Sequence, residues 1–280
     1  MAGTEQADPV QAPGRRDGPD LTGRASLNAV ASGLDYGVRA GVELAVTPLL
    51  VGGLGPAVYG AWRVLWQWSG YVWGASGRSA QSLQFAIANR QHTASDQEKR
   101  ELVGAALVVW LLFVPLVVAA GALGVWLAPV ILDVAPDQEL PLRLAAAVLV
   151  VDALAVTVLT LPRSALQGEN LGYTRMAISP LMVAVGGALM VAAVKLDTGL
   201  PGVATATVLT TTLTGWVFWR ITRHRIHWFG AARPGRQLVR WFLGLSLWFL
   251  GWKFVLELIL ASDILVLAFF APMTLVAAFA

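Results

Sequence analysis

The sequence predicts an all-α, polytopic helical membrane protein with about seven complete transmembrane helices and the start of an eighth. Two observations support this fold class. Hydrophobic residues make up 56% of the 280 residues and charged residues only 13%, whereas a soluble domain carries about 25% charged residues. Apolar stretches of about 18 residues or more, long enough to cross a bilayer, recur along almost the whole chain.

The first 25 residues are polar and rich in Gly and Pro, and they contain no apolar core of a signal peptide. They therefore predict a disordered tail. The apolar stretches that follow predict membrane spans near 27–52, 58–88, 102–132, 142–162, 176–195, 201–221 and 238–260, with an eighth from about 264. A basic loop over 222–240 separates the sixth span from the seventh.

The distribution of Lys and Arg predicts the orientation. Fourteen of these residues lie in the tail and in the loops after the second, fourth and sixth spans, against only Arg143 and Lys195 in the loops on the other side. Because Lys and Arg accumulate in cytoplasmic loops, we expect the N-terminus and the basic loop in the cytoplasm. An excess of basic residues, here a net charge of +3, can indicate nucleic-acid binding. Because these residues lie in loops between spans, topology explains them better, and we expect no nucleic acid among the partners.

The first span carries three charges at four-residue spacing, Asp35, Arg39 and Glu43, which places them on one helix face. Arg39 can pair with either acid. Three glycines lie on roughly the opposite face: Gly33, Gly37 and Gly41. A lipid-facing charge costs about 2.5–3.5 kcal/mol, so the charged face either forms a buried ion network or lines a cavity. The glycine face predicts a close approach to a neighbouring helix.

A polar stripe runs along the second predicted span at steps of three and four residues: Arg63, Gln67, Gly70, Gly74, Arg78 and Gln81. A stripe of this length in an apolar chain needs water or a polar partner helix beside it. Three tryptophans follow it along the same span: Trp62, Trp66 and Trp73. These rings either anchor the helix at the membrane interface or stack on sugar rings in a cavity.

Charges inside the predicted spans are nearly balanced. The cations are Arg39, Arg63, Arg78 and Lys253, and the acids are Asp35, Glu43, Asp152 and Glu257. Cations lining a cavity suit a phosphate or pyrophosphate group, because Arg binds two oxygens at once. The acids either hold these cations in place or take up protons or sodium.

A weak internal repeat relates the first span to the seventh. Arg39 and Glu43 are echoed by Lys253 and Glu257 at the same spacing, and each pair precedes a Pro that follows a small residue. Internal duplication is frequent in transporters and places the substrate at the interface of the repeats. Because the second copy stops within a hydrophobic segment, we expect a truncated protein.

Motifs for other chemistry are weak. His224-x-x-His227 has no third ligand nearby, and no GxSxG, phosphate-binding GxxxxGK[ST] or HExxH motif occurs. Cysteine is absent. We therefore expect no metal, no cofactor and no catalytic residue.

Several segments resemble the polysaccharide (O-antigen type) flippases of the multidrug/oligosaccharidyl-lipid/polysaccharide exporter superfamily. The resemblance covers about residues 26–280 and is carried by four segments: Leu54-Gly55-Pro56-x-x-Tyr59-Gly60-x-Trp62, Arg163-Ser164-Ala165-Leu166-Gln167-Gly168, the spacing of small residues from Arg175 to Arg220, and Ser262-Asp263-Ile264-Leu265-Val266. Ala271-Pro272 departs from the family's usual Leu-Gly pair, and Phe279 stands where a Tyr is common.

The resemblance implies a fold of two six-helix lobes. Residues 26–221 would then form the first lobe, and 241–280 would begin a second, incomplete lobe. It also implies a function, namely alternating-access translocation of lipid-pyrophosphate-linked oligosaccharides across the bacterial cytoplasmic (inner) membrane for polysaccharide or lipopolysaccharide synthesis. The implied partners are the lipid-linked oligosaccharide, membrane lipids, and glycan polymerase or ligase machinery. The substrate-binding residues would be Arg39, Arg63, Arg78, Lys253, Gln67 and Gln81.

Three other functions stay open. In an ion-coupled exporter of cationic drugs, the acids rather than the arginines would carry function. In a membrane-embedded glycan ligase or acyltransferase, catalytic residues usually occupy a large external loop, and the longest such loop predicted here has only about ten residues. A truncated first lobe without a partner lobe would be inactive, since one lobe cannot enclose a transport path.

Overall fold

The computed structural model describes residues 21–74, 76–175 and 178–260, and within these ranges the secondary structure is helical, with no strand. Eight α-helices and one 3-10 helix follow one another in these ranges: α1 (Leu21–Leu54), α2 (Pro56–Gly74), α3 (Ser79–Asn89), α4 (Asp96–Leu132), α5 (Pro136–Gly168), η1 (Gly172–Arg175), α6 (Ile178–Lys195), α7 (Gly199–Arg225) and α8 (Arg236–Leu260). Five of them, α1, α4, α5, α6 and α8, are long and apolar enough to cross a membrane. The protein is therefore a multi-pass helical membrane protein, as the sequence predicts.

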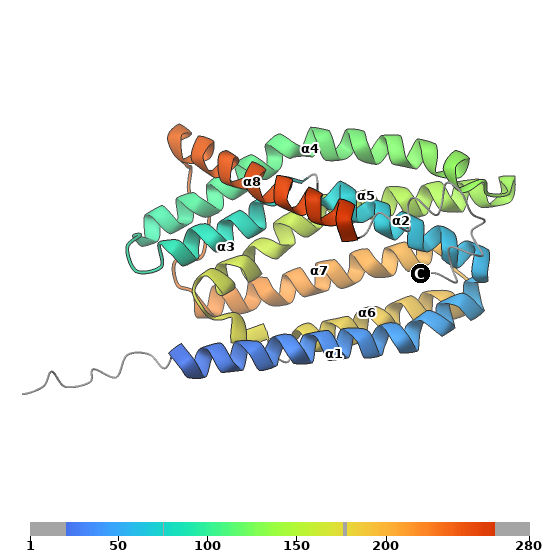
Figure 1. Ribbon diagram of the computed structural model, residues 1–280, viewed down its shortest axis with the longest axis horizontal. Helices are drawn as coiled ribbons and strands as arrows, with labels where there is room; N and C mark the ends of the chain where they lie inside the picture. Colours follow the sequence, from blue (N-terminus) through green and yellow to red (C-terminus); the bar gives the residue numbers. More distant parts are fainter. Residues whose placement is uncertain (1–20, 75, 176–177, 261–280) are drawn as a thin grey trace, which may run out of the picture.

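The order of the helices in space differs from their order in the chain. α1 lies beside α6, α6 beside α7, α7 beside α5, α5 beside α4, and α4 beside α8. In Figure 1, α1 and α6 form the lower edge of the bundle, α7 runs through its middle, and α4 and α8 lie along the upper edge. α5 also contacts α2 and α3, so it is the central helix to which the two halves of the second predicted span attach.

The second predicted span, 58–88, is not one helix. α2 ends at Gly74 and α3 begins at Ser79, because Gly77 and Arg78 adopt left-handed backbone conformations with φ of 77° and 51°. Such angles cannot continue a right-handed α-helix. The prediction of one polar stripe along a continuous helix is therefore wrong. Residues 63–74 and residues 78–81 lie on separate helices.

The turn between the first two helices is confirmed. Gly55 has φ of 82°, a conformation that glycine adopts without steric cost, and Pro56 opens α2. Proline is favoured at this position because its fixed φ suits a helix and its missing N–H would be unpaired there. The Gly-Pro corner thus directs the chain from α1 into α2.

Several helix boundaries differ from the predicted ones. α1 begins at Leu21, inside the segment predicted as a disordered tail, and α7 and α8 shorten the predicted basic loop to 226–235. This loop packs onto the bundle, with Trp228 only 2% exposed and Ile226 4% exposed. The predicted eighth span and the second-lobe segment from Ser262 lie outside the described residues.

The apolar core divides into two main clusters at opposite ends of the bundle. One is built around Tyr59, Trp62 and Leu149, and the other around Leu83, Leu166 and Phe218. The α2–α3 break lies between them.

Candidate functional site

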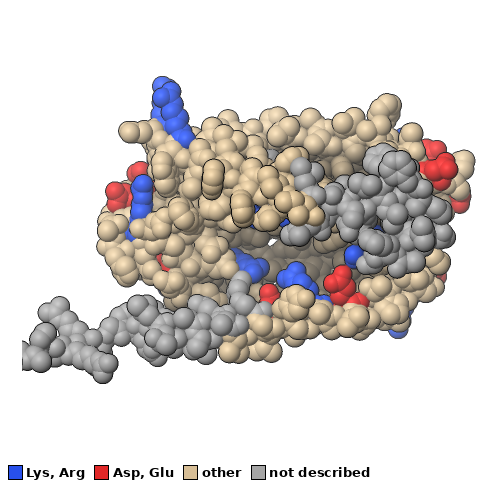
Figure 2. All heavy atoms as spheres, in the orientation of Figure 1, with Lys and Arg blue, Asp and Glu red and all other residues tan. Residues whose placement is uncertain are grey.

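A polar pocket of about 340 Å³ lies between α1, α2, α6 and α7. We call it the four-helix pocket. Its lining includes Arg39 and Glu43 from α1, Arg63 from α2, and four threonines, Thr47, Thr207, Thr210 and Thr211. Figure 2 shows the molecule hollowed between α8 and α1, with basic and acidic atoms inside and along the hollow. The charged face of the first span thus lines a cavity.

Two ion pairs organise the charges of α1. Arg63 Nη1 donates a hydrogen bond to Glu43 Oε1 at 3.3 Å and so links α2 to α1. Arg39 Nη2 lies 3.8 Å from Asp35 Oδ2, within α1. The sequence allowed Arg39 to pair with either neighbouring acid on its own helix, but Glu43 pairs with another helix instead. Arg39 and Glu43 keep side-chain exposures of 60%, so both reach open space.

Contrary to the prediction, the glycine face of α1 makes no close contact with the described residues. A Cβ added at Gly33, Gly37 or Gly41 would meet no atom of the described residues within 4 Å. The close approach between α1 and α6 is made by Gly187, where an added Cβ would lie 2.7 Å from Val42 and 2.9 Å from Val46. The small residue that permits packing therefore lies on the partner helix.

Aromatic side chains form one wall of the four-helix pocket. Trp62 and Trp66 have ring centroids 5.8 Å apart with their planes at 32°, and both line the pocket with Tyr59. Trp62 is 4% exposed and belongs to the core, whereas Trp66 is 42% exposed. Trp66 therefore offers a ring face to a bound molecule.

A second polar pocket, of about 310 Å³, lies at the α2–α3 break. We call it the break pocket. Its polar lining is Ser76, Arg78, Gln81, Gln84, Thr157, Thr160, Arg163, Ser164 and Gln167. Both Nε and Nη2 of Arg78 donate to Gln81 Oε1, at 3.1 and 2.8 Å, and the guanidinium carbon lies 4.9 Å from the centre of the Trp73 ring.

The predicted substrate-binding residues are therefore distributed over separate places. Arg39 and Arg63 share the four-helix pocket, and Arg78 and Gln81 share the break pocket. Gln67 is half-buried on α2, between these two groups. Arg163, one of the fourteen Lys and Arg residues predicted in the tail and the cytoplasmic loops, lies within α5 and lines the break pocket. The spacing Thr157, Thr160, Ser164, Gln167 was the signal that one face of α5 is polar.

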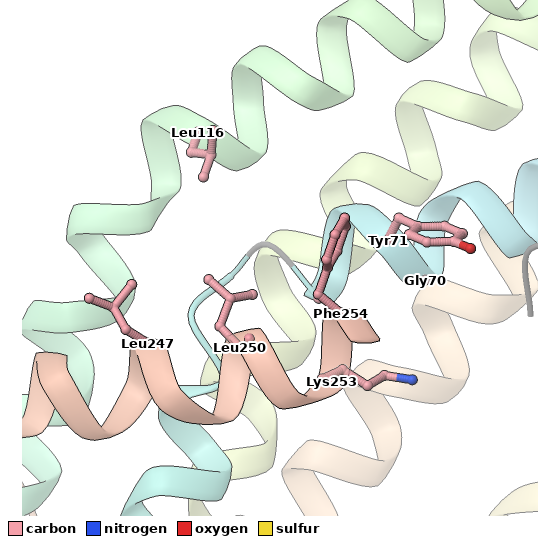
Figure 3. A pocket seen from close by; sticks show the side chains of 9 residues that line it. Gly70, Tyr71, Leu116, Leu247, Leu250, Lys253 and Phe254 are labelled. Atoms are coloured by element: carbon pink, nitrogen blue, oxygen red, sulfur yellow. The ribbon is translucent and has the colours of Figure 1, made fainter. Parts of the chain in front are cut away.

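Lys253 lies at a third, largely apolar pocket of about 400 Å³ between α2, α4 and α8, which we call the apolar pocket. Figure 3 shows Leu116, Leu247, Leu250 and Phe254 around it, while the ammonium group of Lys253 points away from the leucines. Glycines open this space, because a Cβ added at Gly74 or Gly251 would meet no described atom within 4 Å. Glu257, the predicted partner of Lys253, has a side chain outside the described part.

Two further groups of charged residues lie inside the bundle. Asp152 on α5 is half-buried, and its Oδ1 is buried with no hydrogen-bond partner among the described residues. Lys99 Nζ lies 2.7 Å from Glu169 Oε1 and donates to the Gln91 carbonyl at 3.0 Å. Trp228 Nε1 donates to the same Glu169 oxygen at 3.1 Å. This buried network ties the loop before α8 to α4 and α5. Lys99 is one of the fourteen Lys and Arg residues that predict the orientation, and the charge pattern alone does not reveal its buried partner.

Within the described ranges, no group of three or more His, Cys, Asp and Glu side chains is placed to hold a metal ion. His227 Nε2 lies 2.9 Å from Asp96 Oδ2 at the surface. It joins the loop before α8 to the start of α4.

Comparisons with known proteins give a match only at the level of structure. No protein-family model matches the chain, and no curated protein matches it. An inward-facing multidrug resistance MATE family transporter of the MOP superfamily matches with a TM-score of 0.61 and 17% identity, over 90% of this chain and 59% of that one. The outward-facing conformation of a multidrug resistance MATE family transporter matches with a TM-score of 0.59 and 19% identity, over 83% of this chain and 53% of that one.

A MOP superfamily transporter from Pyrococcus furiosus matches with a TM-score of 0.56 and 20% identity, over 81% of this chain and 51% of that one. The class defined by the helices is thus a multi-pass membrane protein. More particularly, its fold is similar to that of part of the MATE and MOP superfamily transporters in these solved structures. The chain spans just over half the length of these solved structures.

Proposed function

We propose that the protein is a membrane transporter of the MATE/MOP type whose cargo is a lipid-pyrophosphate-linked oligosaccharide, moved across a bacterial cytoplasmic membrane with the N-terminus in the cytoplasm. One observation carries the choice of an anionic cargo. Among the described residues, the four-helix and break pockets are lined by four arginines, Arg39, Arg63, Arg78 and Arg163, and by one carboxylate, Glu43. Arginine forks bind phosphate oxygens in pairs.

The aromatic wall of the four-helix pocket supports a sugar-bearing cargo. Trp66 exposes its ring beside Arg39 and Arg63 in one pocket, and the amphipathic ring of Trp suits a surface that is partly apolar and partly polar. The Pyrococcus furiosus transporter is described as having a binding pocket of reverse polarity that suggests a different function. The same fold therefore accommodates pockets of different charge.

Replacement of Arg63 by Gln is expected to lower the rate of flipping at least about tenfold. The variant loses the charge-assisted bond to Glu43 and one charge for the cargo, and a bond to a charged group contributes about 1.5–3 kcal/mol. The measurement uses proteoliposomes that contain the purified full chain and a fluorescent lipid-pyrophosphate oligosaccharide. Transfer to the outer leaflet is followed by its accessibility to a membrane-impermeant quencher.

Arg143→Gln is the matched control, because Arg143 pairs with Glu139 within α5 at 3.4 Å and is 43% exposed, away from both polar pockets. It should flip at the wild-type rate. Flipping by Arg63→Gln equal to the control, or no flipping by the wild-type chain, would overturn the proposal.

A lipid carrier also needs room for its hydrocarbon chain, which the apolar pocket offers. Gly251→Leu is expected to weaken binding of the lipid-linked cargo about tenfold, because displacing two methylene groups costs about 1.6 kcal/mol. Open space at Gly251 lets the new side chain enter without a clash. Microscale thermophoresis in detergent measures the Kd.

Gly244→Leu is the control for the apolar pocket. Gly244 lies on the same helix with equally open space, but it does not line this pocket. Equal weakening by both variants would show that the pocket holds no part of the cargo.

The second candidate is an ion-coupled multidrug exporter, which the fold of the two MATE structures favours. Glu43 is a half-exposed carboxylate inside the four-helix pocket and suits a cationic drug. For that function, Glu43→Gln or Asp152→Asn abolishes drug efflux, whereas Arg63→Gln leaves it intact. The two functions thus make opposite predictions for Arg63→Gln.

A further inference from the structure

The α2–α3 break has a defined geometry that positions the Arg78 side chain. Arg78 is a non-glycine residue with φ of 51°, an uncommon conformation that persists only where neighbouring contacts support it. The Thr157 hydroxyl of α5 donates to Ser76 Oγ at 3.0 Å in the buried interior, and the Ser82 hydroxyl donates to the Arg78 carbonyl at 3.3 Å. These bonds hold both sides of the break, so the direction of Arg78 is set before any ligand arrives.

The opposite wall of the break pocket is one face of α5. Thr157, Thr160, Arg163 and Gln167 follow at steps of three and four residues and all line the pocket. The guanidinium carbon of Arg163 lies 5.7 Å from the centre of the Phe218 ring on α7. An aromatic face stabilises a cation in this position, so the second guanidinium is also held in place.

Two guanidinium groups, three glutamine amides and several hydroxyls therefore converge on about 310 Å³. No Asp or Glu is among the described residues that line this space. Ala80, in the first turn of α3, also lines it, so the positive end of that helix dipole faces the same volume. The four-helix pocket differs, since its arginines share the space with Glu43.

An oxyanion with several oxygens matches this set of donors better than a cation or a neutral sugar. Arginine presents paired N–H groups whose spacing fits two oxygens of one phosphate, and glutamine N–H₂ groups can donate to the remaining oxygens. The volume lies at the lower end of the range of small-molecule pockets, about 300–1,000 Å³. It therefore suits a phosphate or pyrophosphate group.

We infer that the break pocket is a separate binding site for a phosphate-class oxyanion, held by Arg78 and Arg163 from opposite walls. The oxyanion comes either from a lipid head group or from free phosphate or pyrophosphate in solution. A lipid-linked source rests on the proposed function, whereas oxyanion binding itself is measured without transport.

The first experiment titrates the purified full chain, in an uncharged maltoside detergent, with sodium pyrophosphate and with sodium phosphate by isothermal titration calorimetry. Saturable binding is expected. Arg78→Gln and Arg163→Gln should each raise the Kd at least tenfold, and Arg143→Gln should leave it unchanged. Wild-type binding that does not saturate, or an equal Kd in all four proteins, would overturn the site.

A second variant covers the case in which an arginine variant does not fold. Gln167→Leu keeps a side chain of similar size on the same face of α5 but removes an amide donor. It should raise the Kd severalfold while circular dichroism and the melting temperature stay at wild-type values. If neither arginine variant folds and Gln167→Leu leaves the Kd for pyrophosphate unchanged, the site is contradicted.

The two sources of the oxyanion are separated in nanodiscs. Pyrophosphate is titrated into the protein in discs of phosphatidylcholine alone and in discs with phosphatidic acid added. If phosphatidic acid weakens pyrophosphate binding in the wild-type protein and this effect depends on Arg163, the lipid head group occupies the site. If phosphatidic acid has no effect, the occupant is the free anion. If the protein binds pyrophosphate through Arg163 but does not flip the lipid-linked oligosaccharide, the site stands and the proposed function is wrong. If it flips this cargo but binds neither pyrophosphate nor phosphatidic acid, the proposed function stands and the site is wrong.

Discussion

Replacement of Lys99 by Met is expected to lower the free energy of unfolding by about 3–5 kcal/mol, the usual cost of leaving a buried charge without its partner. Lys99 is 7% exposed, and its ammonium lies 2.7 Å from Glu169 Oε1. Without Lys99, Glu169 keeps only the bond from Trp228 Nε1 at that oxygen. Unfolding by SDS in mixed micelles, followed by circular dichroism, measures the change.

Arg143→Met is the exposed counterpart of this variant. Arg143 and Glu139 form an ion pair at 3.4 Å with side chains 43% and 45% exposed, so its loss should cost less than about 1 kcal/mol. The double variant Lys99→Met with Glu169→Leu should recover much of the lost stability, because no buried charge then remains. Equal costs for Lys99→Met and Arg143→Met would contradict the interpretation of a buried network.

Replacement of Gly77 by Ala is expected to lower the free energy of unfolding by about 2–6 kcal/mol. Gly77 has φ of 77°, and an added Cβ would lie 2.5 and 2.6 Å from two ring carbons of Phe113 on α4. The backbone strain of a non-glycine residue here costs about 1–3 kcal/mol, and the overpacking adds a similar amount. The same SDS titration measures the loss.

Gly37→Ala tests whether the effect comes from this position alone. Gly37 lies inside α1 with no described atom near an added Cβ, so Ala should stabilise the helix by about 0.5–1 kcal/mol. A second test combines Gly77→Ala with Phe113→Ala, which removes the clash but not the strain. If Gly77→Ala and Gly37→Ala changed stability in the same direction, the left-handed turn at the break would not be required.

The sequence alone determined the class of protein and the approximate place of its helices. The spans predicted near 102–132, 142–162 and 176–195 correspond to α4, α5 and α6. Hydropathy predicts these helices because the free energy of moving a segment into a bilayer depends on the residues of that segment alone. Each segment must also satisfy its own backbone hydrogen bonds in the bilayer, which favours a helix. The Gly55-Pro56 corner was equally predictable, since both residues act through their own backbone angles.

Only the tertiary structure decided how the charged residues associate. Four-residue spacing allows Arg39 to pair with Asp35 or Glu43, and the position of α2 brought Arg63 to Glu43 instead. Arg163 lines a pocket because α5 faces the α2–α3 break. The local spacing reveals that this face of α5 is polar, but it does not reveal which helices the face meets. The same holds for Gly187, which lets α1 approach α6 while the glycines of α1 itself face open space. Hydropathy is a sum over residues that are neighbours in the sequence. Ion pairs and cavities depend instead on which helices, distant in the sequence, pack together, and the shapes of the helix surfaces determine that packing.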